Sequence, residues 1–324
     1  MNILDNIKTP IQDEMKSFEA MFKASMKSNV PLLTIITNYI LRRKGKQMRP
    51  MFVFLTAKLN GNITPDTYTA ASLIELLHTA TLIHDDVVDE SYERRGLFSI
   101  NALWKSKIAV LMGDYLLTKG LLIAIEHKAY DLLEIVSEAV REMIQGELLQ
   151  IQRSRSFGTT REQYLEIIRM KTATLIAACT ASGAKSAGSD DDTVARMKLF
   201  GEYIGIAFQI KDDLLDYQAE GITGKPSGND IKDKKLTLPL IYSLENSSFL
   251  ERKSILLKIS RYKKKSNNIQ PIIDFVTSKG GLDYAYSTMN EYIEKALSLL
   301  ESYPESEVKD SLIGLVNYTI DRKK

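Results

Sequence analysis

Apolar residues recur at steps of three and four along most of the chain, as at Leu73, Leu76 and Ala80. This spacing places them on one face of an α-helix, whereas strict alternation over the length of a strand is rare. No proline occurs between Pro65 and Pro226, and good helix formers dominate that stretch. The pattern predicts long helices throughout, several of them apolar on most faces and therefore central.

The sequence predicts a single all-α domain over residues 1–324. Thr64-Pro65-Asp66 is typical of a helix start, with Thr64 as N-cap and Pro65 at the first helical position. No stretch indicates a linker that would divide the chain, and the least regular ones are residues 220–239 and 263–270. No short-period repeat indicates a solenoid.

The composition is that of an ordinary globular protein. Of the 324 residues, 44 % are hydrophobic and 26 % are charged, which excludes intrinsic disorder. The formal net charge is +2, so no global basic excess points to nucleic acid, and we expect no nucleic-acid partner.

The sequence favours a cytoplasmic location. Cys179 is the single cysteine, which excludes a disulfide framework and suits a reducing compartment. The first residues carry charges and lack the apolar core of a signal peptide. No run reaches the roughly 18 apolar residues that suggest a membrane span, and the longest candidates are residues 31–41 and 175–184.

One acidic pattern occurs twice. Residues 83–89 read IHDDVVD and residues 210–216 read IKDDLLD. On a helix Asp85 and Asp89 lie one turn apart on a shared face, and the second motif has the same spacing. The apolar pair inside each motif can point back into the core.

Like charges at this spacing repel each other, so a helix that carries them within an apolar run needs a compensating cation. A solvated acidic face is the alternative, and two copies embedded in apolar sequence argue against it. Oxygen ligands without nearby His or Cys suit Mg²⁺ or Ca²⁺ rather than zinc, and the glycine and terminal glutamate of an EF-hand are missing. Mg²⁺ bound by few carboxylates usually completes its shell with water and phosphate oxygens, which indicates a diphosphate substrate.

Basic and polar side chains near both motifs could bind such a substrate, although any one of them alone is more often a surface charge. They are Lys46, Arg49, His78, Arg94, Arg95, Lys171, Thr172, Gln209, Lys225 and Lys235.

With these residues in place, the chain resembles the trans-isoprenyl diphosphate synthases. The resemblance rests on an ordered set of motifs that spans most of the chain: GKxxRP, HxxxxxxDDxxD, RRG, KT, FQxxDDxxD and GKPxGxD with KxTLP. They stand at residues 45–50, 78–89, 94–96, 171–172, 208–216, 224–230 and 235–239. The resemblance implies an all-α bundle of many antiparallel helices around a central active-site cavity, the isoprenoid synthase type.

The resemblance also assigns roles residue by residue. It implies that isopentenyl diphosphate is bound by Lys46, Arg49, His78 and Arg95. It implies that Mg²⁺ is bound by Asp85, Asp89 and Asp212, with support from Asp86, Asp213 and Asp216. It implies that the allylic diphosphate is contacted by Arg94, Lys171, Thr172, Gln209, Lys225 and Lys235. Gln47 and Lys234 depart from the family pattern, which often has a basic residue and a glycine there.

The expected reaction adds isopentenyl diphosphate repeatedly to an allylic diphosphate. Ala80 and Thr81 lie about one turn, or 5.4 Å, before Asp85, where short-chain members of the family tend to carry aromatic rings. Because both side chains are small, we expect the product tunnel to continue past Leu77. This predicts a hexaprenyl to nonaprenyl product, with octaprenyl as the central expectation and a quinone side chain as its destination.

Several alternatives remain at this stage. A farnesyl or geranylgeranyl synthase differs only in product length, and a terpene cyclase would not need Lys46, Arg49 and His78. A catalytically silent partner subunit would lack the aspartates, and a Ca²⁺-binding helical scaffold would show no turnover. The resemblance implies a homodimer, and release of a long product makes transient membrane contact plausible.

Overall fold

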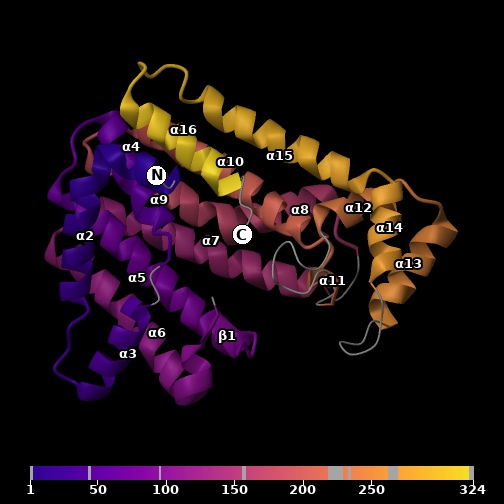
Figure 1. Ribbon diagram of the computed structural model, residues 1–324, viewed down its shortest axis with the longest axis horizontal. Helices are drawn as coiled ribbons and strands as arrows, with labels where there is room; N and C mark the ends of the chain where they lie inside the picture. The colour runs from indigo at the N-terminus through magenta and orange to yellow at the C-terminus, as the bar shows by residue number, and fades with distance from the viewer. Residues whose placement is uncertain are drawn as a thin grey trace. The chain divides into compact units, whose positions relative to one another are not determined.

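The computed structural model describes residues 3–42, 45–94, 96–154, 158–217, 229–232, 235–261 and 269–320. These residues are almost entirely helical, and the strands among them form one hairpin of two residues on each side (Figure 1). The all-α class predicted from the apolar periodicity is confirmed.

The first half of the chain contains α1 (Ile3–Lys8), η1 (Thr9–Ile11), α2 (Gln12–Ser25), α3 (Pro31–Arg42), α4 (Met48–Asn60), α5 (Pro65–Val88), β1 (Glu93–Arg94), β2 (Leu97–Phe98), α6 (Ile100–Glu126) and α7 (Tyr130–Ser154). The second half contains α8 (Arg161–Ile168), η2 (Arg169–Ala173), α9 (Thr174–Ser186), α10 (Asp191–Leu215), α11 (Asn229–Lys232), α12 (Leu238–Glu245), α13 (Phe249–Arg261), α14 (Gln270–Ser278), α15 (Gly281–Ser298) and α16 (Glu307–Ile320).

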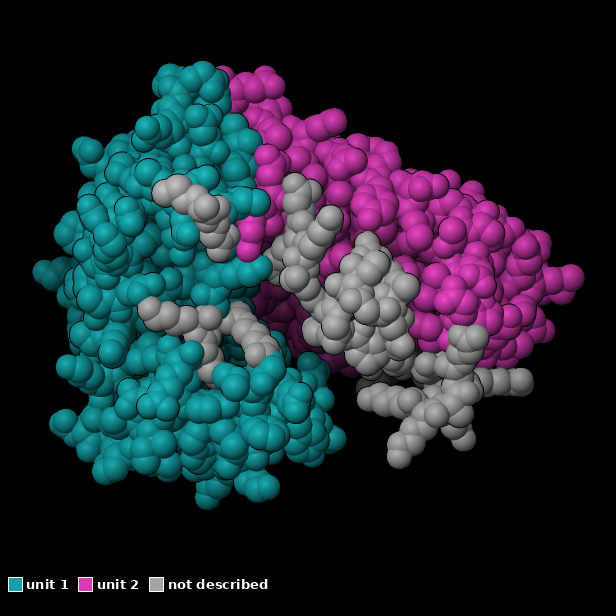
Figure 2. Space-filling view, in the orientation of Figure 1, with its two compact units in different colours: residues 1–138, 178–198, 304–315 teal, residues 139–177, 199–303, 316–324 magenta. Residues whose placement is uncertain are grey.

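The chain divides into two compact units, which Figure 2 shows in teal and magenta. Unit 1 consists of residues 1–138, 178–198 and 304–315, and unit 2 of residues 139–177, 199–303 and 316–324. Helices α7, α9, α10 and α16 contribute residues to both units. The expectation of one domain stays a prediction.

In unit 1, α5 is a central helix of 24 residues whose sides are mostly buried. It begins as predicted: Thr64 is the N-cap, and its backbone N–H donates to Thr67 Oγ1 at 3.1 Å. The Thr64 hydroxyl donates to the carbonyl of Ser186 at 2.9 Å and so ties the helix start to the end of α9. A buried, capped helix of this length is a rigid support for the side chains at its far end.

The core of unit 2 is built around α12, whose Leu240 and Leu244 are buried among apolar residues of α13 and α14. Helix α12 also packs against α15, where the rings of Tyr242 and Tyr284 stack with centroids 4.1 Å apart. Tyr217, just after α10, is buried in the same cluster, so the end of α10 is fixed to this core.

Helix α6 departs from the sequence expectation about membrane spans. Among the described residues it is the one helix long and apolar enough to cross a membrane by length and composition, and about a third of that stretch is buried. Charged Asp114 and Lys119 lie within this helix, and neither stretch named in the sequence analysis, 31–41 or 175–184, meets the criterion. A core helix meets the same criterion, so the finding by itself is weak evidence for a membrane span.

Candidate active site

The first acidic motif lies at the C-terminal end of α5. The helix ends at Val88, so Asp85 and Asp86 belong to its last turn and Asp89 is the C-cap residue. Asp85 and Asp89 are exposed. The C-terminus of a helix carries a partial negative charge, which adds to the repulsion among the carboxylates and makes this position favourable for a bound cation.

Asp86 differs from its two neighbours because it is buried and already paired. Arg94 Nε of strand β1 donates to Asp86 Oδ1 at 2.7 Å. The Asp86 carbonyl accepts from the Ser91 N–H at 3.0 Å and from Asn101 Nδ2 at 3.2 Å. Asp86 therefore fixes the hairpin to the end of α5, beside the two exposed carboxylates.

A cavity of about 720 Å³ lies within unit 1 and brings together several of the predicted residues. His78, Asp86 and Arg94 line it, together with the segment around Gly45 and Gln47 and side chains of α2 and α3. Among the described residues predicted to bind isopentenyl diphosphate, His78 is the one that lines this cavity.

Other members of that predicted site are placed differently. Lys46 is exposed and Arg49 is half-buried, and neither side chain lines the cavity. The positive charge of Arg49 acts on the buried Cys179 thiol. Arg95 lies outside the described residues, as do Lys225 and Lys234.

The second acidic motif repeats the first in unit 2. Helix α10 ends at Leu215, so Asp212 and Asp213 lie in its last turn and Asp216 in the turn that follows. Asp212 is exposed, Asp216 is half-buried and Asp213 is buried. In both motifs the middle aspartate is thus the buried one.

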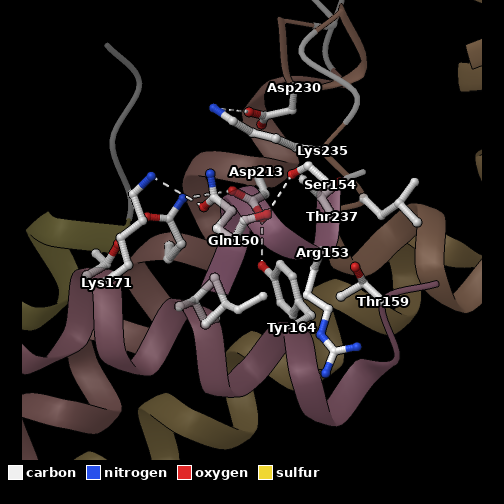
Figure 3. A pocket seen from close by; sticks show the side chains of 15 residues that line it. Gln150, Arg153, Ser154, Thr159, Tyr164, Lys171, Asp213, Asp230, Lys235 and Thr237 are labelled. Atoms are coloured by element: carbon white, nitrogen blue, oxygen red, sulfur yellow. Dashed lines mark hydrogen bonds and ion pairs between the residues drawn. The ribbon is translucent and has the colours of Figure 1, made fainter. Parts of the chain in front are cut away.

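A chain of hydrogen bonds holds Asp213 from two sides (Figure 3). Tyr164 OH donates to Asp213 Oδ2 at 2.6 Å, and Gln209 Nε2 donates to Oδ1 at 2.8 Å. Thr172 Oγ1 in turn donates to Gln209 Oε1 at 2.7 Å. The predicted residues Thr172, Gln209 and Asp213 therefore form one connected network.

Burial sets the electrostatics of this network. Burial, with the nearby Asp230 carboxylate as the next contribution, raises the pKa of Asp213 to about 8. Burial next to Asp213 also raises the pKa of the Tyr164 phenol well above its usual value, so Tyr164 stays protonated and remains a donor. A nearby cation would stabilise the charged form of a buried carboxyl group whose pKa is raised in this way.

Lys171 occupies an irregular point of its helix. Residues Arg169–Ala173 form a π-helical turn between α8 and α9, a feature often found at functional sites. Gly146 of α7 lies so close that a Cβ atom there would be 2.8 Å from the Lys171 backbone nitrogen. The Lys171 ammonium pairs with Glu147 and donates to Gln150 Oε1 at 3.3 Å.

These groups share a small pocket of about 100 Å³ within unit 2. Lys171, Thr172, Gln209, Asp213 and Lys235 line it, as predicted residues that the fold brings together. The pocket is further lined by residues that sequence reasoning did not select, among them Gln150, Arg153, Tyr164 and Asp230. Tyr164 lies seven residues before Lys171, a spacing of two turns that could have singled it out.

Asp230 connects the segment after α10 to the motif. Its backbone N–H donates to Asp216 Oδ2 at 3.0 Å, and its carbonyl accepts from the Lys235 N–H at 2.9 Å. Lys235 Nζ lies 3.9 Å from Asp230 Oδ1. Asp216 and Lys235 are therefore held on either side of Asp230.

The predicted chain-length residues lie within unit 1. Leu77 and Ala80 are buried, and Ala80 belongs to an apolar cluster with α6 residues such as Met112 and Leu116. Thr81 is half-buried, and its hydroxyl donates to the His78 carbonyl at 2.9 Å. Their role in product length stays a prediction.

Within the described part of the chain, no three His, Cys, Asp or Glu side chains are grouped closely enough to hold a metal ion. The first motif belongs to unit 1 and the second to unit 2. Asp85 and Asp89 in unit 1 and Asp212 in unit 2 are exposed, and Asp216 in unit 2 is half-buried. Oxygen-only donors of this kind fit a hard divalent cation.

Comparison with known proteins decides the family. A sequence model of the polyprenyl synthetase family matches residues 30–276. The chain belongs to the polyprenyl synthetase family. The resemblance seen in the sequence motifs is thereby confirmed, and the enzyme is a prenyltransferase.

Relatives of this enzyme are similar over their whole length. The all-trans-nonaprenyl-diphosphate synthase (geranyl-diphosphate specific) of Rhodobacter capsulatus is 34 % identical over 98 % of this chain and 97 % of its own. The octaprenyl diphosphate synthase of Escherichia coli (strain K12) is 32 % identical over 99 % of both chains. These relatives support a polyprenyl diphosphate synthase of the long-chain type.

A solved relative supports the fold. The crystal structure of polyprenyl synthase from Caulobacter crescentus CB15 has a TM-score of 0.90 and 31 % identity, covering 99 % of this chain and 98 % of that one. That protein is complexed with calcium and isoprenyl diphosphate. The isoprenoid synthase type of bundle is therefore the fold of this enzyme.

Proposed function

We propose that this enzyme catalyses Mg²⁺-dependent, head-to-tail addition of isopentenyl diphosphate to an allylic primer such as geranyl or farnesyl diphosphate. The cycle repeats to give a long all-trans polyprenyl diphosphate, with octaprenyl as our central expectation. The observation that carries the proposal is the pair of aspartate motifs, each at the C-terminal end of a buried helix and each next to cationic side chains.

The residues fit a divalent cation. Asp85 and Asp89 would hold it in unit 1, and Asp212 and Asp216 in unit 2, with Asp86 and Asp213 fixing the two helix ends. When bound, Mg²⁺ supplies Lewis acidity that makes diphosphate a better leaving group. The calcium and isoprenyl diphosphate in the relative from Caulobacter crescentus support a divalent metal in this family.

The chain's own side chains have separate tasks in this proposal. Lys171, and Arg94 on the β1 strand, stabilise the negative charge that grows on the diphosphate as the allylic C–O bond breaks. His78 lines the cavity in unit 1, and Lys46 and Arg49 remain the other described residues that we propose for isopentenyl diphosphate. An apolar helical core keeps water away from the allylic cation.

The carbon chemistry then balances without a side-chain base. The double bond of isopentenyl diphosphate attacks the allylic cation and forms the new C–C bond. Loss of a proton to the released diphosphate restores a double bond. The product is again an allylic diphosphate, so the same groups can act in the next cycle.

We also propose a homodimer in the cytoplasm whose product becomes a quinone side chain. Helix α6 exposes Val110, Leu111, Leu122 and Ile125, which fall within about a third of the helix circumference at 100° per residue. An apolar stripe of this kind suits coverage by the same helix of a second copy.

The decisive experiment is turnover. The purified enzyme is incubated with farnesyl diphosphate, labelled isopentenyl diphosphate and Mg²⁺, and the prenyl alcohols are sized after dephosphorylation. We expect long products with Mg²⁺, none with chelator, and a loss of more than about a hundredfold in Asp85→Asn because transition-state charge stabilisation is lost. Geranylgeraniol as the end product, or farnesol when geranyl diphosphate replaces the farnesyl primer, would instead establish the short-chain alternative, and absence of turnover with either primer a silent subunit.

Product length has its own test. Ala80→Phe places a ring one turn before Asp85 and should shorten the product. Because Ala80 is buried against α6, thermal unfolding of the variant is measured alongside. A folded variant with unchanged product length contradicts the assignment of Ala80 to the tunnel floor.

A further inference from the structure

Helix α13 (FLERKSILLKISR) presents an apolar surface that its own unit does not cover (orange in Figure 1). Ile255 and Ile259 are buried in the core of unit 2. Phe249 and Leu250 at the start of the helix are 77 % and 76 % exposed, the highest values among the large apolar side chains of the described residues. Leu257 is also exposed, at 43 %.

These exposed residues lie on a defined side of α13. Leu250 and Leu257 are seven residues apart, or two turns, and therefore share a face. At 100° per residue this face points roughly opposite to Ile255 and Ile259. Lys253 follows Leu250 by three residues and precedes Leu257 by four, so its stem lies between the two leucines.

The same helix is basic at its surface. Arg252, Lys253 and Lys258 are exposed, and Lys253 and Lys258 make no ion pair with any residue that the structure describes. The single acid of the helix, Glu251, is neutralised by Lys279 of the α14–α15 turn at 2.9 Å. The outward face therefore combines apolar side chains with uncompensated positive charge.

Single exposed leucines are common, but an adjacent Phe and Leu followed along the helix by lysines without an ion pair to any described residue are typical of helices that lie in a membrane interface. Lysine stems can pack along apolar surface while their ammonium groups reach anionic headgroups. Coverage by a second copy of the same face is disfavoured, because a symmetric contact would bring the lysines of the two copies together.

We propose that α13 docks this enzyme on an anionic lipid bilayer. Phe249, Leu250 and Leu257 enter the interface between headgroups and acyl chains, while Lys253 and Lys258 contact the lipid phosphates. The docking itself is independent of catalysis. Its use, delivering an apolar product to the bilayer, rests on the proposed function.

The test is flotation of the full chain with vesicles. Phosphatidylcholine vesicles with and without phosphatidylglycerol are compared at low and high salt. We expect binding to the anionic vesicles, weakened by salt because the headgroup attraction is screened. Lys253→Glu/Lys258→Glu should lower the partition coefficient at least about tenfold, since each basic residue near the surface contributes roughly a factor of five.

A second variant probes the apolar contribution. Phe249→Gln/Leu250→Gln should also weaken binding by about tenfold or more, because two interface-buried side chains are lost. The matched control is Leu32→Gln/Ile35→Gln on α3, which removes exposed apolar side chains, 42 % and 58 % exposed, from a helix whose one charged residue is Arg42. This control should bind like the wild type.

Three outcomes would overturn the proposal: equal binding by all variants, equal binding to neutral vesicles, or self-association through α13 without lipid binding. Thermal unfolding shows that each variant is folded. Turnover in detergent is measured in parallel, and we expect it to be unchanged in the α13 variants. Failure of the wild type to turn over would reject the proposed function and leave the vesicle result standing.

Discussion

At the scale of single residues, the two motifs hold their buried carboxyl group in different ways. Asp86 is held by the guanidinium of Arg94, whereas Asp213 is held by the neutral donors Tyr164 and Gln209. A buried carboxyl group with neutral donors keeps a raised pKa, while one paired with arginine gains a compensating charge. The α10 motif therefore depends more on the protein groups around it.

Tyr164→Phe tests this dependence. Removing the hydroxyl leaves the buried Asp213 Oδ2 without its partner, so we expect a loss of roughly 1–3 kcal/mol in the free energy of unfolding and lower turnover. The matched control is Tyr286→Phe, which removes a hydroxyl from an exposed tyrosine. Thermal unfolding of both variants measures the difference, and equal melting temperatures would show that the hydrogen bond from Tyr164 to Asp213 does not stabilise the protein.

Cys179 gives a prediction about reactivity. Burial, opposed by the weaker effect of Arg49, raises the pKa of its thiol to about 12. Because a raised pKa leaves almost no thiolate at pH 8, the folded protein should not react with a thiol reagent such as Ellman's reagent. One thiol should appear when denaturant is added, whereas rapid reaction without denaturant contradicts the buried position.

At the scale of elements, the placement of helix ends matters most. Both aspartate motifs end a helix, at Val88 and Leu215. The sequence predicted the helices but not these ends, because no glycine or proline directly follows either motif. A helix terminus makes the carboxylates accessible, which the middle of a helix would not.

The contact between α7 and the π-helical turn leads to a prediction about Gly146. Replacing a helical glycine with alanine normally stabilises a helix by up to about 1 kcal/mol. Here the new Cβ would meet the Lys171 backbone nitrogen at 2.8 Å, so Gly146→Ala should destabilise the protein and displace Lys171.

Gly314→Ala on α16 is the control, since its Cβ would meet the flexible Ile7 side chain at 3.3 Å. Melting temperature and turnover are compared for the two variants. A Gly146 variant that matches the Gly314 variant in both would show that the close approach is unimportant.

At the scale of the whole molecule, the exposed stripe on α6 predicts how copies associate. Leu111→Glu/Leu122→Glu places charges on side chains that are 55 % and 47 % exposed. The isolated fold should tolerate them, while an apolar interface should not. Light scattering after gel filtration should show a dimer for the wild type and a monomer for this variant.

Ile35→Glu on α3, also exposed, is the control and should remain dimeric. A wild-type monomer, or a double variant that stays dimeric, would remove α6 as the interface.

The sequence carried the class of the fold and most of the chemistry. Apolar periodicity and the scarcity of proline sufficed for an all-α chain, and Thr64-Pro65 located the start of α5. The repeated aspartate motif singled out Asp85, Asp89 and their counterparts, because like charges within an apolar helix require a cation whatever the surrounding fold.

Tertiary structure decided what depends on contacts between distant segments. Three such contacts join residues that no sequence pattern connects. They are the hydrogen bond from Tyr164 to Asp213, the ion pair of Arg94 with Asp86, and the close approach of Gly146 to Lys171. Periodicity reports which side of a helix is apolar, but only packing determines which polar side chains on neighbouring helices meet. For that reason the sequence alone identified the charged groups of this enzyme, and the fold selected the partners that hold them.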